Sequence, residues 1–207
     1  MRLTPDLLNE IARLTLEHLQ LVIISLLIAA AIALPAGILL TRVARLRRLL
    51  LGFASVVQTI PSLALFGFLI PLPLFGGIGE RTAIIALVLY ALLPILRNTF
   101  TGIMGVDPAV RDAAVAMGLT GRQLLWMVEL PLASRTILAG IRIAAVTTIG
   151  TATIAAAIGA GGLGVFIFRG VASVDTTQLL AGAVPAAAIA LLSDGGLGWL
   201  ERRFSPA

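Results

Sequence analysis

The sequence has 207 residues, of which 59% are hydrophobic and only 12% charged, with a net charge of +5 and a mean hydropathy of +1.07. Soluble domains average about 45–50% apolar and about 25% charged residues, so this composition excludes a disordered chain and argues against a water-soluble globule. It is typical of a helical membrane protein, in which five spans of about 20 residues would use roughly half of the chain. In so apolar a chain, the positive charge indicates arginines that face the cytoplasm rather than a nucleic-acid partner.

The residue types that are missing exclude several kinds of chemistry. There is no cysteine and a single histidine, His18, which excludes disulfides, cysteine nucleophiles and metal sites built from several histidines. All fifteen basic residues are arginine, so the lysine of a phosphate-binding loop is absent. We therefore expect no cofactor and no metal on this chain, no catalytic residues of its own, and any ATP hydrolysis on another polypeptide.

The chain begins with a predicted amphipathic helix within residues 1–15. Thr4 can cap it, Pro5 suits its first position, and leucines and isoleucines recur at helical spacing. We expect this helix to lie on the membrane surface. A signal peptide is not expected, because a basic start, an apolar stretch and a small-residue cleavage site do not follow one another here.

Five apolar runs then follow as predicted transmembrane spans. They cover residues 16–40, 49–70, 82–96, 136–158 and 179–192, the last extending to about 200. Pro35 should kink the first span near its end. The loop 41–48 carries four arginines, which are typical of a topology determinant and a lipid-headgroup anchor.

The arginine distribution predicts the orientation of the spans. If the loop 41–48 lies in the cytoplasm, eleven arginines fall on the cytoplasmic side and four outside, in agreement with the positive-inside rule. The four outside are Arg2, Arg13, Arg81 and Arg169. An odd number of spans then places the N-terminus outside and the C-terminus in the cytoplasm. No internal repeat or linker divides residues 1–207, so a single transmembrane domain is expected.

The most polar stretch, residues 101–135, predicts two short cytoplasmic helices. Asp107 can cap the first helix, and Gly118 can end it with a positive φ. Thr120 can cap a second helix, which Pro131 should end. A rigid helix–turn–helix between two spans would make a suitable docking surface for a partner.

This segment resembles the "EAA" motif of permease subunits in binding-protein-dependent ABC importers. The resemblance runs from Asp112-Ala113-Ala114 through Gly118 to Val128 and Leu130-Pro131, with Asp in place of the usual Glu and Val in place of the usual Ile. In that family the first short helix sits in a groove of the ATPase subunit. The resemblance thus implies an ATPase-coupling role for Arg111, Asp112, Ala113, Ala114, Met117 and Gly118.

Further motifs resemble the glycine betaine/carnitine/choline branch of these permeases. They are Gln58-Thr59-Ile60-Pro61-Ser62-Leu63-Ala64, Leu93-Pro94-Ile95-Leu96-Arg97-Asn98-Thr99, Gly150-Thr151-Ala152-Thr153 and Ile158-Gly159-Ala160-Gly161-Gly162-Leu163-Gly164. The resemblance, which runs from about Glu17 to Arg203, implies an all-α, type I importer permease in a bacterial inner membrane that carries quaternary ammonium solutes. A permease for another solute, such as an amino acid, and a stand-alone secondary transporter are the alternatives.

The same resemblance implies a set of partners. These are an ATPase dimer that holds ATP and Mg, an external solute-binding protein, and a second permease subunit, identical or closely related. Some members carry the binding domain fused at the C-terminus. Because this sequence stops at Ala207, we expect its binding protein to be a separate chain.

Polar side chains inside the predicted spans, or in the case of Asn98 at the cytoplasmic end of one, are candidates for lining the solute path. They are Gln58, Thr59, Ser62, Asn98, Thr147 and Thr151. Each has a structural alternative, because hydroxyls and amides also satisfy backbone carbonyls freed by a proline or bond between helices.

Three other features have simpler explanations than a binding site. Residues 159–164 match the glycine spacing of dinucleotide-binding loops, but a long apolar run precedes them, so a tight external turn, an external gate or a contact for the binding protein is expected instead. Asp194 should form a structural ion pair with Arg142 or Arg97. His18 should act as an anchor at the outer edge of the first span.

Overall fold

The computed structural model describes residues 5–73 and 76–204, and within these ranges it contains helices and no strands. The helices are α1 (Pro5–Arg42), α2 (Ala44–Thr59), α3 (Ser62–Leu69), α4 (Glu80–Met104), α5 (Pro108–Ala116), α6 (Gly121–Leu124), α7 (Leu130–Ile154), α8 (Gly164–Ser173) and α9 (Thr176–Arg203). A π-helical turn, Leu125–Glu129, joins α6 to α7, and a 3₁₀ turn, Ala155–Ile158, extends α7. The predicted all-α fold with several membrane spans is confirmed.

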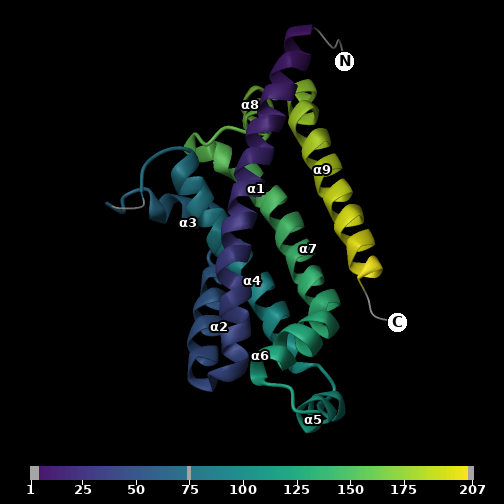
Figure 1. The fold of residues 1–207 in the computed structure, drawn as a ribbon. Coiled ribbons are helices and arrows are strands. Elements are labelled where there is room, and N and C mark those ends of the chain that lie inside the picture. Colours follow the sequence, from purple (N-terminus) through teal and green to yellow (C-terminus); the bar gives the residue numbers. More distant parts are fainter. Residues whose placement is uncertain (1–4, 74–75, 205–207) are drawn as a thin grey trace.

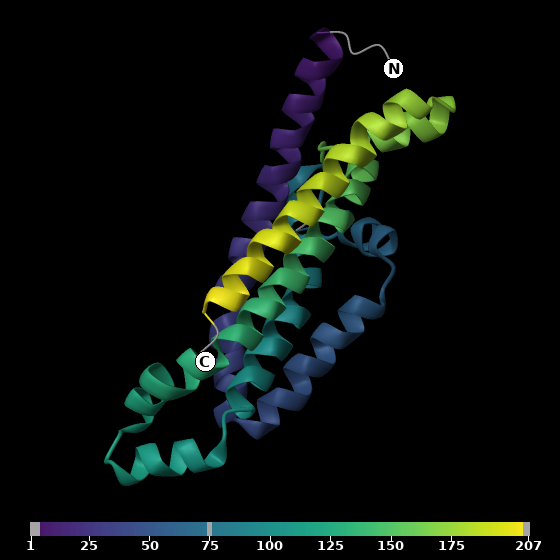
Figure 2. The ribbon, with the colours of Figure 1, turned by 90° about the vertical axis from the view of Figure 1, so that its right-hand side faces the viewer.

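Four helical runs are long and apolar enough to cross a membrane: α1, α4, the run Gly121–Ile158 and α9. The pair α2 and α3 makes a fifth candidate, which is bent by 104°. Figures 1 and 2 show an elongated bundle in which α1, α4 and α7 run side by side, α9 lies along α7, and α2 lies beside α4. Helices α5 and α6 lie at one end of the bundle, while α8 and the start of α1 lie at the other.

Helix α1 is continuous from Pro5 to Arg42, through Pro35. The described part of the helix predicted within residues 1–15 forms the first turns of α1, and Leu7 and Ile11 there pack against the buried cluster that contains Leu14. The predicted place of these turns on the membrane surface stays a prediction, and Arg2 and the cap Thr4 lie outside the described residues. His18 is on the buried face of α1 with no exposed surface, so its predicted role as an interfacial anchor is wrong.

The second predicted span, residues 49–70, is not one straight helix. It breaks between Thr59 and Ser62, because Ile60 precedes a proline and is extended, with φ −74° and ψ 127°. Two hydrogen bonds between α4 and the residues on either side of the break hold it. The side-chain amide of Gln58 donates to the Tyr90 carbonyl at 3.0 Å, and the Tyr90 hydroxyl donates to the Ile60 carbonyl.

Helix α9 is the fifth predicted span, and polar contacts at both ends fix it. At its start, the Thr177 amide donates to the Asp175 carboxylate, which lowers the pKa of that carboxyl. Nearer its end, Arg142 of α7 lies 3.5 Å from the Asp194 carboxylate and 3.4 Å from Glu201. The predicted ion pair of Asp194 is thus confirmed, with Arg142 as its partner.

Candidate coupling segment and translocation face

Helix α5 projects from the end of the bundle, and its local structure is as the sequence predicts (Figures 1 and 2). Asp107 accepts a hydrogen bond from the Ala109 amide at 2.8 Å, and Pro108 occupies the first helical position. Gly118 ends the segment with a φ of +83°, in the left-handed region that favours glycine. The cap at Asp107 and the left-handed Gly118 therefore define α5 as a short arm with a fixed start and end.

The second helix of the segment also begins as predicted but does not end at Pro131. Thr120 and Gln123 form a complete capping box. The π turn that follows is closed by a bond from the Leu130 amide to the Leu125 carbonyl, five residues back. We attribute the continuity into α7 to this wider turn, which relieves the local ladder that Pro131 would otherwise interrupt.

Most of the residues implicated by the EAA-like motif lie on the free surface of α5. Asp112, Ala113, Met117 and Gly118 are exposed, and 74% of the Met117 surface is free. Ala114 is buried, facing the body of the protein. An exposed apolar and acidic face on a projecting helix is the geometry that a docking surface needs.

Arg111 and Glu129, a residue outside the EAA-like and path candidates, connect α5 to the bundle. Glu129 is 1% exposed, and its carboxylate lies 2.5 Å from Arg42 Nη2 and 3.4 Å from Arg111 Nε. Arg111 also donates through Nη2 to the Ile103 carbonyl at the end of α4. In the sequence, Glu129 is noticeable only as the single acidic residue in the apolar run that follows the Thr120 cap.

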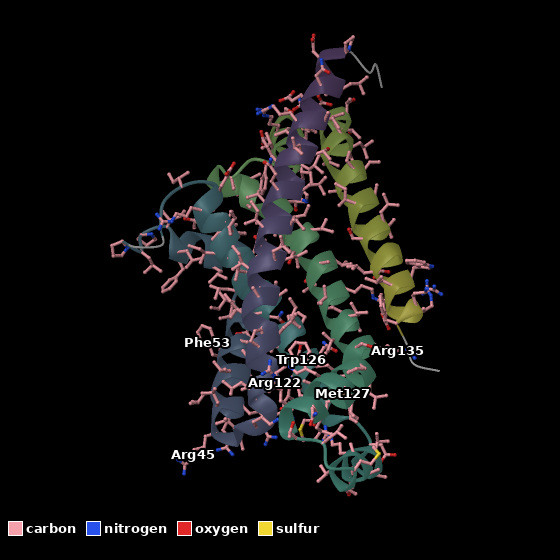
Figure 3. The ribbon with its side chains drawn as sticks, in the orientation of Figure 1. Arg45, Phe53, Arg122, Trp126, Met127 and Arg135 are labelled. Atoms are coloured by element: carbon pink, nitrogen blue, oxygen red, sulfur yellow. The ribbon has the colours of Figure 1, made fainter. Side chains whose placement is uncertain are left out.

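Other exposed side chains gather in the half of the molecule that carries α5. Figure 3 shows Arg45, Arg122, Trp126 and Met127 there. Trp126 and Met127 are mostly exposed, and with Thr120, Arg122 and Gln123 they line an open hollow of about 460 Å³. The second helix therefore adds apolar and basic surface beside α5.

The path candidates on α7 share one exposed face. The Thr147 hydroxyl donates to the Ile143 carbonyl, and the Thr151 hydroxyl to the Thr147 carbonyl, each at 2.8 Å within the helix. Ile143, Thr147 and Gly150 are all exposed at helical spacing. Because the hydroxyls bond within α7, this face is only mildly polar.

The remaining path candidates lie in two other places. Gln58, Thr59 and Ser62 flank the break between α2 and α3, where Gln58 is tied to α4. Asn98 instead packs between α4 and α7. Its amide donates to the Pro94 carbonyl at 2.8 Å, and a methyl group at Gly140 would come within 2.5 Å of its Cβ. Its contacts are those of a packing residue.

The glycine-rich segment is a tight turn packed on the start of α1. Gly159, Gly161 and Gly162 all have positive φ, and the Gly162 amide donates to the Glu17 carboxylate at 3.2 Å. The 3₁₀ end of a long helix precedes the turn, rather than the strand that a dinucleotide loop requires. The turn therefore has a packing role at the end of the bundle opposite α5.

Comparison with known proteins identifies the architecture. The model of the family "binding-protein-dependent transport system inner membrane component" matches residues 18–206. In structure, the chain is similar to a subunit of the inward-facing MetNI methionine ABC transporter, with a TM-score of 0.88 at 23% identity, covering 99% of this chain and 100% of that one. This likeness shows the fold of an ABC importer permease.

Several relatives are similar in sequence over almost the whole chain. The carnitine transport permease protein OpuCB of Listeria monocytogenes is 46% identical over 93% of this chain and 87% of its own. The glycine betaine/carnitine/choline permease protein OpuCD of Bacillus subtilis is 45% identical over 92% and 82%. The osmoprotectant import permease protein OsmW of Salmonella typhimurium is 44% identical over 96% and 91%. The chain therefore belongs to the family of inner-membrane components of binding-protein-dependent transport systems.

Proposed function

We propose that the chain is the permease subunit of an ATP-driven importer for osmoprotectants such as glycine betaine, choline and carnitine. The observation that carries the proposal is the identity of 44–46%, over at least 92% of the chain, to permeases named for these solutes. The likeness to the methionine transporter is at 23% identity and supports the fold alone, so an amino acid is not the favoured solute.

The partners follow from the same membership. A permease of this kind works with an ATPase dimer, which binds ATP and Mg, with an extracytoplasmic binding protein, and with a second permease subunit, identical or closely related. The exposed face of α5, with Asp112, Ala113, Met117 and Gly118, is the proposed docking surface for the ATPase. The face of α7 and the break after Thr59 are the proposed contributions to the solute path.

The arginine distribution supports a cytoplasmic position for α5. The described arginines are concentrated at the α1–α2 junction, in α5 and in the helices that follow it, whereas Arg13 lies in the first turns of α1, Arg81 at the start of α4 and Arg169 in α8. With the basic half inside, α5 faces the cytoplasm, the start of α1 lies outside and the end of α9 lies inside.

Solute selection is assigned mainly to the binding protein. Quaternary ammonium groups are held by cages of aromatic rings through cation–π attraction. The chain has eleven aromatic residues (eight Phe, two Trp and one Tyr), and Phe53, Phe68, Trp126 and Trp199 are spread over α2, α3, the π turn and α9.

The test is transport by the complex purified with its partners and reconstituted in liposomes. ATP-dependent accumulation of radiolabelled glycine betaine, choline or carnitine, only in the presence of the binding protein, is the expected result. Accumulation by the permease alone would overturn the importer assignment. A binding protein with affinity for amino acids and none for these three solutes would overturn the solute assignment.

A further inference from the structure

Arg42, Arg111 and Glu129 form an ion cluster around the buried Glu129 carboxylate. Each member comes from a different part of the chain. Arg42 is the last residue of α1, Arg111 lies in α5, and Glu129 is the last residue of the π turn. The Glu129 side chain is 2% exposed, whereas those of Arg42 and Arg111 are 46% and 22% exposed. The carboxylate is therefore the enclosed centre of the cluster.

The cluster is one of few connections between α5 and the bundle. Ala114 is the buried residue of α5, and Arg111 is its side chain whose polar contacts reach other elements. Arg111 binds Glu129 and the last turn of α4. A displacement of α5 by a partner would therefore be felt first at these contacts.

The other arginine of the cluster lies at a hinge. Val43, with φ −123° and ψ 90°, interrupts the helix between Arg42 and Ala44. Beyond it, α2 leads to the break at Ile60, where Gln58 and Tyr90 are bonded. Glu129 thus connects α5, through Arg111, to the joint from which α2 departs, through Arg42.

We propose that Glu129 is a positioning residue that transmits movement of α5 to the α1–α2 hinge through its ion pairs with Arg111 and Arg42. The proposal rests on the proposed coupling function of α5. A charge-assisted contact at 2.5 Å between buried or half-buried groups resists separation more than apolar contacts do, because separation would leave the carboxylate enclosed and unpaired. The enclosed carboxylate therefore favours joint movement of its two partners.

The first test measures coupling in the complete reconstituted transporter. Glu129→Gln and Arg42→Gln should raise the ATP hydrolysed per radiolabelled glycine betaine transported by about tenfold, the usual scale of coupling between sites. Arg42→Lys keeps one charge and should recover part of the coupling. Glu201→Gln is the matched control, since Glu201 also holds two arginines but joins α7 to α9, and it should keep the parental ratio.

A second test reads the movement itself. The chain has no cysteine, so paired spin labels can be introduced at exposed positions: Val115 on α5, Leu49 on α2 and Leu192 on α9. On trapping with ATP and vanadate, the Val115–Leu192 and Leu49–Leu192 distances should both change in the parent. In Arg42→Gln, the first change should persist and the second should disappear.

The outcomes separate this proposal from the coupling function on which it rests. Uncoupling by Asp112→Arg, with normal coupling in Glu129→Gln and Arg42→Gln, would overturn the role of Glu129 and leave the role of α5 intact. Normal coupling in all three variants would overturn both. Equal uncoupling by Glu201→Gln would also overturn it, by showing that any buried ion pair matters. If Glu129→Gln fails to assemble, the coupling ratio of Arg42→Gln is the test, because Arg42 is half-exposed. Normal coupling in Arg42→Gln then overturns the proposal.

Discussion

Gly118 shows how a single residue can fix the shape of the proposed docking arm. Its φ of +83° is strained for side chains with a Cβ, whereas a Cβ built there would meet no atom within 4 Å. Glycine is therefore favoured at position 118 by the backbone conformation and not by a lack of space. Residues that tolerate the left-handed region should replace it better than residues that do not.

Gly118→Val is expected to distort the turn after α5 and to uncouple ATP hydrolysis from uptake, because a β-branched residue at positive φ costs about 1–2 kcal/mol or more. Gly118→Asn is the matched control, since asparagine tolerates this conformation, and it should retain most of the coupled uptake. Both are measured as solute transported per ATP in the reconstituted complex. Coupling in the Val variant equal to that of the parent would contradict this role.

At the residue scale, local chemistry was predictable and distant pairing was not. The caps at Asp107 and Thr120 and the positive φ of Gly118 depend on neighbours within a few positions, and all three are confirmed. Glu129 pairs with Arg42 across 87 positions, which no local pattern reports. The burial of His18 likewise depends on helices packed against α1, not on its own segment.

At the element scale, the prolines have different effects on the helices in which they lie. Pro61 follows an extended residue, and the break is held by Tyr90 on α4. Pro131 follows a π turn and leaves the helix continuous, while Pro35 lies inside α1. The sequence shows where the backbone amide is missing, but it does not show whether the helix breaks or continues there. Hence the five runs were predicted, whereas the bend in the second and the continuity at Pro131 were not.

Tyr90→Phe tests what holds the break. Removing the hydroxyl leaves the Ile60 carbonyl without this donor, which should lower stability by about 1 kcal/mol. The measurement is the unfolding temperature of the purified complex in detergent. Thr59→Val is the control, because its hydroxyl bonds to Val56 within α2 and does not join two helices. An unfolding temperature unchanged by Tyr90→Phe would argue against the bond as a clamp.

At the scale of the whole molecule, much apolar surface is exposed on the isolated chain, as a subunit in lipid requires. The mildly polar face of α7 differs from the leucine-rich face of α9, where Leu191 is 74% exposed. The composition and the number of apolar runs predicted the architecture, because a chain that crosses a lipid bilayer needs apolar helices long enough to span it. Which face meets solute depends on a second subunit, so it stays a proposal.

The absence of cysteine permits a direct map of these faces. Thr147→Cys and Gly150→Cys should react with a water-soluble maleimide in the assembled transporter, because the proposed path admits water. Leu191→Cys should react with the maleimide at least about tenfold more slowly. Maleimides react with the ionised thiolate, and a thiol that faces lipid does not ionise readily. Fast labelling at Leu191 with protection at Thr147 would place the path elsewhere.

Labelling of Val115→Cys with a membrane-impermeant maleimide shows whether α5 faces the cytoplasm and contacts an ATPase. Val115 is 57% exposed on α5. We expect labelling in inside-out vesicles stripped of the ATPase, protection when the ATPase is restored, and no labelling in right-side-out vesicles. Labelling from the outside, or equal labelling with and without the ATPase, would contradict this assignment of α5.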